Sequence, residues 1–295
     1  MMRHRPVVTV AVAGAMLLLS ACSTAVSPSR TPASPDGGAP SPESTALSGE
    51  DIRAHIADAE WSFAPDGLLE PFTVEFHEGT ATDDSGRTYE IGTGVEGDAD
   101  GDGVVDLAVP VSQHDGNGLL ELWYIWLGAG DDTVATQVLY PIARTTRCGD
   151  AVHSVAAADP GFRIEQTLWM PHTDEDRDCA DGGTGAQVRD VSVDVIDGVA
   201  YPIQTVPIAA WGGVCPRSDW LDGILDDTVE GRAAPAAAAP TVFEAGEEVA
   251  VYELPSATLL TRDGVKFFGF QTADPTAKSG ATDATAVMMH CAFAG

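Results

Sequence analysis

The sequence contains few positive charges. Its 15 Lys and Arg residues stand against 45 Asp and Glu residues, and Lys266 and Lys278 are its only lysines. Nucleic-acid phosphates and anionic lipid surfaces are bound mainly through Lys and Arg. A formal net charge of −30 therefore argues against a nucleic-acid partner and against a polybasic membrane contact. The same charge suits divalent cations, basic partners or simple solubility.

The sequence also lacks the short motifs of common catalysts. It contains no H-E-x-x-H, G-x-S-x-G, S-x-x-K or phosphate-binding P-loop pattern. The six histidines after His4 are scattered and share no metal-ligand spacing. Acidic residues are too abundant for a glycosidase-like pair of carboxylates to be located from the sequence. No reaction is therefore assigned from sequence motifs.

The N-terminal segment carries a targeting pattern. Arg3 and Arg5 precede the apolar run Val7 to Leu19, which is too short to span a bilayer comfortably. We therefore expect residues 1–21 to be a signal peptide. The ending Leu19-Ser20-Ala21-Cys22 resembles the lipobox of bacterial lipoproteins, in which the signal is cut before an acylated cysteine. That resemblance implies lipidation of Cys22 and anchoring to the outer face of the cell membrane. The alternative is an ordinary signal peptide with a coincidental Cys.

Composition divides the rest of the chain. Residues 22–48 are rich in Ser, Thr, Pro and Ala without apolar periodicity, which is typical of a disordered tether. We expect one β-rich domain over residues 49–170, which holds an acidic loop. A second β-rich lobe is expected over residues 185–295, and the sequence leaves open whether the two are one domain.

The folded part is expected to be mainly β to α+β, with antiparallel sheets and a short N-terminal helix at 50–60. Alternating or apolar runs predict the strands, including 72–76, 119–127, 134–139, 191–195 and 265–270. Asp197-Gly198 predicts a hairpin turn, and residues 218–222 a short helix. Trp123 and Trp126 are a candidate sugar-stacking platform, but such aromatics are more typical of a hydrophobic core.

The acidic loop carries the most specific chemical pattern. Asp98, Asp100 and Asp102 stand at alternate positions, followed by Gly103 at the sharp turn. Val104 would offer its carbonyl and Asp106 its carboxylate. A hard cation such as Ca²⁺ takes six to eight oxygen ligands, and these closely spaced carboxylates repel one another without a cation. The sequence therefore predicts a structural calcium site. Its alternative is an Asp/Gly-rich turn with weak or no metal binding.

The pattern D-x-D-x-D-G-x-x-D resembles the calcium loops of dockerin, thrombospondin type 3 and integrin-propeller repeats. It departs from an EF-hand because Val109 replaces the bidentate Glu and a strand follows the loop. A looser resemblance over about residues 50–170 is to uncharacterised exported lipoproteins, in which a helix with a Trp, a turn, one acidic loop and apolar strands occur in this order. It implies architecture and address, with no activity.

Four cysteines remain besides Cys22, which suits two disulfides in an oxidising compartment. Of the three possible connectivities we favour Cys148–Cys179 and Cys215–Cys291, because each closes a loop within its own half. A zinc site lacks the required ligand spacing. Asp174, Asp176 and Asp178 repeat the alternate spacing without the turn glycine, so we interpret this segment as an exposed acidic loop.

Two functions fit these patterns. The first is a lipid-anchored, calcium-stabilised envelope protein with a non-catalytic role, either binding of a glycan or protein partner or a purely structural one. The second is an envelope hydrolase acting on cell-wall glycan or peptide through two carboxylates, with structural calcium. An open cleft with two carboxylates, one of them in apolar surroundings, would favour the hydrolase.

Overall fold

A computed structural model describes residues 47–64, 71–130, 134–170, 174–215, 221–224, 230–245, 250–253, 266–273 and 287–294. Residues 44–295 form one compact unit. The predicted signal peptide at 1–21, Cys22 and the tether up to residue 46 lie outside the described residues. Among the described residues, no helix is long and apolar enough to cross a membrane.

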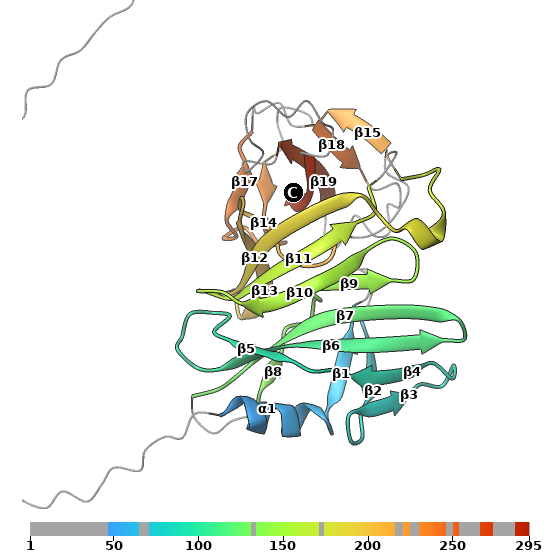
Figure 1. Ribbon diagram of the computed structural model, residues 1–295. Coiled ribbons are helices and arrows are strands. Elements are labelled where there is room, and N and C mark those ends of the chain that lie inside the picture. Colours follow the sequence, from blue (N-terminus) through green and yellow to red (C-terminus); the bar gives the residue numbers. More distant parts are fainter. Residues whose placement is uncertain are drawn as a thin grey trace, which may run out of the picture. The chain divides into compact units, whose positions relative to one another are not determined.

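The described chain is mainly β, with antiparallel sheets and one short α-helix near its start, as the sequence predicts (Figure 1). The helix α1 spans Gly49–Ile56, which is shorter at its C-terminal end than the predicted 50–60. Ser48 caps it, because the Ser48 hydroxyl accepts from the Asp51 N–H while the Asp51 carboxylate accepts from the Ser48 N–H. Arg53 then fixes the helix to the neighbouring sheet through an ion pair with Glu96 at 2.8 Å.

The first half of the chain builds a two-stranded sheet and a seven-stranded sheet. The small sheet pairs β1 (Glu60–Phe63) with β2 (Phe72–Glu75). The large sheet has the order β3-β4-β6-β7-β8, with β5 paired to β6 and β9 paired to β7. Its strands are β3 (Thr80–Thr82), β4 (Thr88–Ile91), β5 (Val95–Gly97), β6 (Asp106–Asp115), β7 (Gly118–Leu127), β8 (Thr136–Gln137) and β9 (Ala143–Thr146).

The five-stranded sheet takes strands from both expected lobes. Its order is β10-β11-β12-β13-β14, that is Ala151–Ala157, Phe162–Leu168, Gly185–Ile196, Val199–Val206 and Ala210–Trp211. The predicted hairpin turn is confirmed between β12 and β13. Both of its residues have positive φ, 52° at Asp197 and 79° at Gly198, as a two-residue turn between twisted strands requires.

The six-stranded sheet has the order β15-β18-β19-β20-β16-β17. These strands are β15 (Leu221–Ile224), β16 (Gly231–Arg232), β17 (Thr241–Phe243), β18 (Ala250–Glu253), β19 (Lys266–Ala273) and β20 (Val287–Ala294). β20 therefore joins two groups of strands that both precede it in sequence. It pairs with β19 on one side and with β16 on the other.

Two sequence predictions differ from the structure. The strand predicted at 134–139 is present but shorter, since only Thr136–Gln137 is β8, which pairs with β7. The contact with β7 continues beyond β8, because the Val138 N–H donates to the Ile125 carbonyl at 2.8 Å. The short helix predicted at 218–222 is wrong where the structure describes it, since Leu221 and Asp222 belong to β15.

The five-stranded sheet lies between the seven-stranded and six-stranded sheets (Figure 1). An apolar cluster that includes Ile125, Phe162 and Val193 fills the first junction. A second cluster around Trp211 and Phe293 fills the other junction. The central sheet therefore packs against a neighbour on each side, although burial alternates along β11, where Arg163 and Glu165 stay exposed.

Both disulfides favoured by the sequence are present, joining Cys148 to Cys179 and Cys215 to Cys291. Cys179 lies in a short 3₁₀ turn, η1 (Cys179–Asp181), and Cys291 lies in β20. Disulfides persist in oxidising compartments, so this pairing points to a location outside the reducing cytosol.

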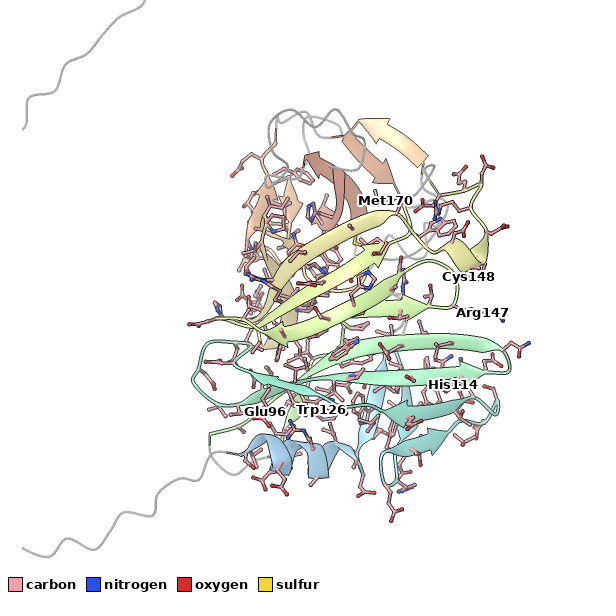
Figure 2. All side chains as sticks on the ribbon, viewed as in Figure 1. Glu96, His114, Trp126, Arg147, Cys148 and Met170 are labelled. Carbon is pink, nitrogen blue, oxygen red and sulfur yellow. A yellow bond between two sulfur atoms is a disulfide. The ribbon has the colours of Figure 1, made fainter. Side chains whose placement is uncertain are left out.

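Trp61 is the centre of an aromatic cluster beneath α1. It is fully buried, and its indole N–H donates to the Ile56 carbonyl at 2.9 Å. Its ring centroid lies 5.0 Å from that of Trp126 and 5.4 Å from that of Phe76. Trp126, labelled in Figure 2, is buried in this core. It is therefore not available to stack against a sugar together with Trp123.

We expect Trp61→Ala to lower the free energy of unfolding by about 3–5 kcal/mol, because it opens a large cavity and leaves a buried carbonyl without its donor. Trp123→Ala is the matched control, since Trp123 is only half-buried and should cost less. Urea denaturation of both variants measures the difference. Equal losses would contradict the central position assigned to Trp61.

Candidate metal centre

The acidic loop connects β5 to β6 and curls into a compact turn. Gly101 and Gly103 have φ values of +78° and +83°, which lie in the left-handed region. A Cβ at either position would meet nothing within 4 Å. Glycine is therefore required here by backbone conformation, not by space, as predicted for Gly103.

Three of the four predicted carboxylates come together. One carboxylate oxygen from each of Asp98, Asp100 and Asp106 lies within 4.8 Å of the others, so this group can hold a metal ion. Asp100 is exposed, Asp98 is half-buried and Asp106 is buried. Asp102 is outside this group, and its carboxylate accepts from the Val104 N–H at 2.7 Å. The ligand role of the Val104 carbonyl stays a prediction.

Backbone donors hold the carboxylates in place. Asp98 accepts from the N–H groups of Gly101 at 2.8 Å and Gly103 at 3.0 Å. Asp100 accepts from the Asp102 N–H at 3.2 Å. These bonds shape the loop from within, because each side chain satisfies an amide of the turn that follows it.

Asp106 binds groups from two different segments. One of its oxygens accepts from the Ala99 N–H at 2.6 Å, and the other accepts from the Gly128 N–H at 2.8 Å. Ala99 lies at the start of the loop, and Gly128 follows the end of β7. The side chain that starts β6 thus closes the loop and attaches it to the neighbouring strand.

Electrostatics favour a cation at this group. Burial raises the pKa of Asp106 to about 6, although its two amide donors act in the opposite direction. Burial also raises the pKa of Asp100, and the charges of Asp102 and Asp98 add to that effect. A bound cation would offset both the desolvation and the mutual repulsion of these carboxylates.

The loop also contacts the central sheet. The Asp98 carbonyl accepts from the Gly161 N–H, and the Ala99 carbonyl accepts from the Val193 N–H, each at 2.7 Å. The Ala99 side chain is fully buried in the cluster between the two sheets. Sequence spacing identified the acids but gave no signal for these contacts with Gly161, Val193 and Gly128.

The second acidic segment has a different role. Asp174 is fully buried, so the prediction of an exposed acidic loop is wrong at this position. Its carboxylate accepts from the Met170 N–H at 2.7 Å, the Thr184 N–H at 2.9 Å and the Thr184 hydroxyl at 2.8 Å. Asp176 and Asp178 are exposed. Among the described residues they form no metal-binding group with Asp174.

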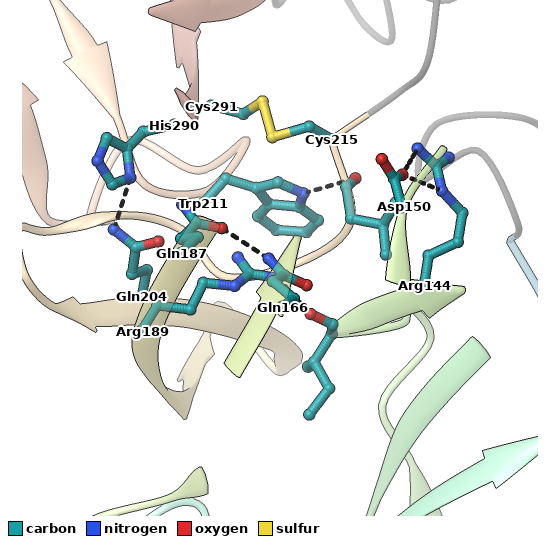
Figure 3. Close-up of a disulfide and its surroundings, with 12 residues drawn as sticks. Arg144, Asp150, Gln166, Gln187, Arg189, Gln204, Trp211, Cys215, His290 and Cys291 are labelled. Atoms are coloured by element: carbon teal, nitrogen blue, oxygen red, sulfur yellow. Dashed lines mark hydrogen bonds and ion pairs between the residues drawn. A yellow bond between two sulfur atoms is a disulfide. The ribbon is translucent and has the colours of Figure 1, made fainter. Parts of the chain in front are cut away.

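A buried polar cluster surrounds the disulfide between Cys215 and Cys291 (Figure 3). His290 bonds to Gln204 at 2.9 Å, and burial together with the charge of Arg189 lowers the pKa of His290 to about 4. Such an imidazole is a weak base near neutral pH, where general-base catalysis works best with a pKa near 7. The neighbouring sulfur of Cys291 is held in a disulfide. The cluster thus supplies internal hydrogen bonds and has no thiol nucleophile.

The raised pKa of Asp106 predicts a pH dependence for the metal-free protein. Its folded pKa of about 6 lies above the ordinary value of 3.8. The stability it contributes is therefore present below pH 4 and is lost as the pH rises through 6, by roughly 3 kcal/mol at most. In chelator, Asp106→Asn should remove this fall, whereas Asp115→Asn, at an exposed acid at the far end of β6, should retain it. Urea denaturation between pH 4 and 7.5 measures the change, and identical profiles for wild type and Asp106→Asn would contradict it.

Comparison of the chain with protein-family models, with curated proteins and with solved structures finds no match.

Proposed function

We propose that this protein is exported, held on the outer face of the cell membrane by a lipid on Cys22, and stabilised by calcium. Its β-rich domain binds a partner in the cell envelope and does not catalyse a reaction. The observation that carries the proposal is the carboxylate group of Asp98, Asp100 and Asp106, placed where one sheet meets the next.

Calcium suits this group better than other common ions. The donors are carboxylate oxygens, which favour hard cations over zinc or copper. In the proposal, Asp98, Asp100 and Asp106 are joined by Asp102 and the Val104 carbonyl when the ion binds. Calcium accepts such irregular oxygen sets, whereas magnesium demands near-octahedral geometry.

The pKa shifts of the described acidic residues support a binding role over a hydrolase. A general acid in a hydrolase needs a raised pKa and access to substrate. Among the described acidic residues, the carboxyls with raised pKa, Asp100 and Asp106, belong to the loop. Asp83, which lines a surface cavity, has its pKa lowered despite a desolvation cost, because Ser85, Tyr89 and Arg87 donate to its carboxylate. The hydrolase alternative therefore has no described pair of acids that suits it.

Thermal melts test the calcium site. For an extracellular dissociation constant of about 10⁻⁴ M, 10 mM Ca²⁺ should add about 2.7 kcal/mol of stability and raise the Tm by several degrees. Asp100→Asn should abolish this rise, and Asp115→Asn, an exposed acid at the far end of β6, should retain it. Mg²⁺ should give a smaller shift. A Tm that does not respond to Ca²⁺ in the wild-type protein would refute the site.

Fractionation of cells tests the anchor. The Cys22→Ser protein should appear in the soluble or secreted fraction, because it lacks the thiol that carries the lipid. Metabolic labelling with a palmitate analogue should mark the wild-type protein only. Unchanged membrane retention and labelling in the variant would contradict lipidation at Cys22.

A further inference from the structure

Two strand edges face each other without pairing. In the described part of the chain, β2 pairs only with β1, and β3 pairs only with β4. The two strands are consecutive and meet at a single bridge between His77 and Thr80. There the His77 N–H donates to the Thr80 carbonyl at 2.9 Å, and the Thr80 N–H donates back at 3.1 Å. Beyond this bridge β2 and β3 do not pair.

The alternation of hydrogen bonds between β1 and β2 shows which backbone groups of β2 are free for a new strand. The Phe76 N–H donates to the Ala59 carbonyl at 3.0 Å, on the β1 side. Successive residues of a strand direct their backbone groups to opposite edges. Val74 therefore pairs towards β1, and Thr73 and Glu75 present their N–H and C=O groups to the other edge.

The same reasoning applies to β3. The Ile91 N–H donates to the Gly79 carbonyl, and the Asp83 N–H donates to the Arg87 carbonyl, both on the β4 side. Odd-numbered positions thus pair towards β4, and Thr82 presents its N–H and C=O groups to the opposite edge. The free groups of β2 and β3 consequently border the same space.

That space is a cavity of about 570 Å³, lined by residues of β2 and of the segment from Ala81 to Arg87. The His77–Thr80 bridge closes one end. The Arg87 guanidinium lies over the Phe72 ring, 5.2 Å from its centroid, at the other end. The hollow is open to solvent between these ends, and β2, a strand of four residues, borders it over roughly 13 Å.

The walls indicate which side chains an inserted strand should carry. Val74 is buried and Ala81 half-buried on the inner side, whereas Glu75 and Asp84 are exposed on the outer side. Asp83 is already neutralised by Arg87 at 2.6 Å. The outer rim is therefore acidic and the inner wall apolar. An inserted strand would match it with alternating apolar and basic residues.

We propose that the gap between β2 and β3 is a docking slot for an extended, basic segment of a partner protein, which adds as a strand joining the two sheets. This inference rests on the binding role proposed above and names the class of partner. Main-chain hydrogen bonds to Thr73, Glu75 and Thr82 would supply affinity, and the acidic rim would select the segment.

The probe is a fluorescein-labelled peptide of sequence Lys-Val-Lys-Val-Lys-Val, mixed with the purified protein in 10 mM Ca²⁺. We expect saturable binding by fluorescence anisotropy and slower amide hydrogen exchange at Thr73, Glu75 and Thr82. The same peptide with methylated backbone nitrogens should bind at least tenfold more weakly, because it cannot donate to the strand edges. Equal binding of the two peptides would overturn strand addition.

Charge variants test the location. Glu75→Gln with Asp84→Asn should weaken binding roughly three- to tenfold, as expected for exposed ion pairs. Glu165→Gln with Asp176→Asn is the matched control, because both residues are exposed and far from the slot in sequence. Equal weakening by both pairs would mean general attraction to an acidic protein and would refute the slot.

Backbone variants complete the test. Thr82→Pro removes one donor at the slot and should weaken binding while the Tm rise in Ca²⁺ is retained. If this variant does not fold, Thr73→Pro on the opposite wall serves the same purpose. A wild-type protein that responds to Ca²⁺ but binds no peptide refutes the slot alone. One that binds the peptide without any response to Ca²⁺ refutes the ion site and keeps the slot.

Discussion

The junction between the seven-stranded and five-stranded sheets depends on how the negative charge of one buried carboxylate, that of Asp106, is balanced. Asp106 lies at the end of the acidic loop. Its two carboxylate oxygens accept hydrogen bonds from the amide of Ala99, at the start of the loop, and from the amide of Gly128, which follows β7. Two amides do not offset the loss of water, which is why its pKa rises. The loop that a cation would steady also offers the Asp98 and Ala99 carbonyls to the central sheet. Charge balance and sheet contact therefore meet in the same nine residues.

Local patterns were sufficient wherever the determining interaction is local. The left-handed turn at Gly103 and the Asp197-Gly198 hairpin turn each depend on residues within a few positions. Sequence spacing failed where the partner is distant. Asp174 lies in a run of acids that reads as solvated, yet Thr184, ten residues later, provides two donors that allow its burial. Nothing in the spacing of the acids announces those donors.

The strands show the same difference between features set by local sequence and features set by distant partners. Alternating or apolar runs located β2, β7, β12 and β19, because burial on one or both faces leaves its pattern in each strand separately. The neighbours of a strand leave no such trace. β7 shares one edge between β8 and β9, and the order of the six-stranded sheet follows no rule readable from its segments. The separation of β2 from β3 was equally invisible, since the two form an ordinary hairpin sequence around Glu78-Gly79.

The position of β20 has a consequence for the order of assembly. β15, β18 and β19 form one group and β16 and β17 another, and among the described strands only β20 bridges them. β20 also carries Cys291, the partner of Cys215. β20 is synthesised after every strand that it joins, so the two groups have no common edge until it is made. Closure of this sheet and oxidation of this cysteine pair therefore follow the synthesis of all the other strands of the sheet.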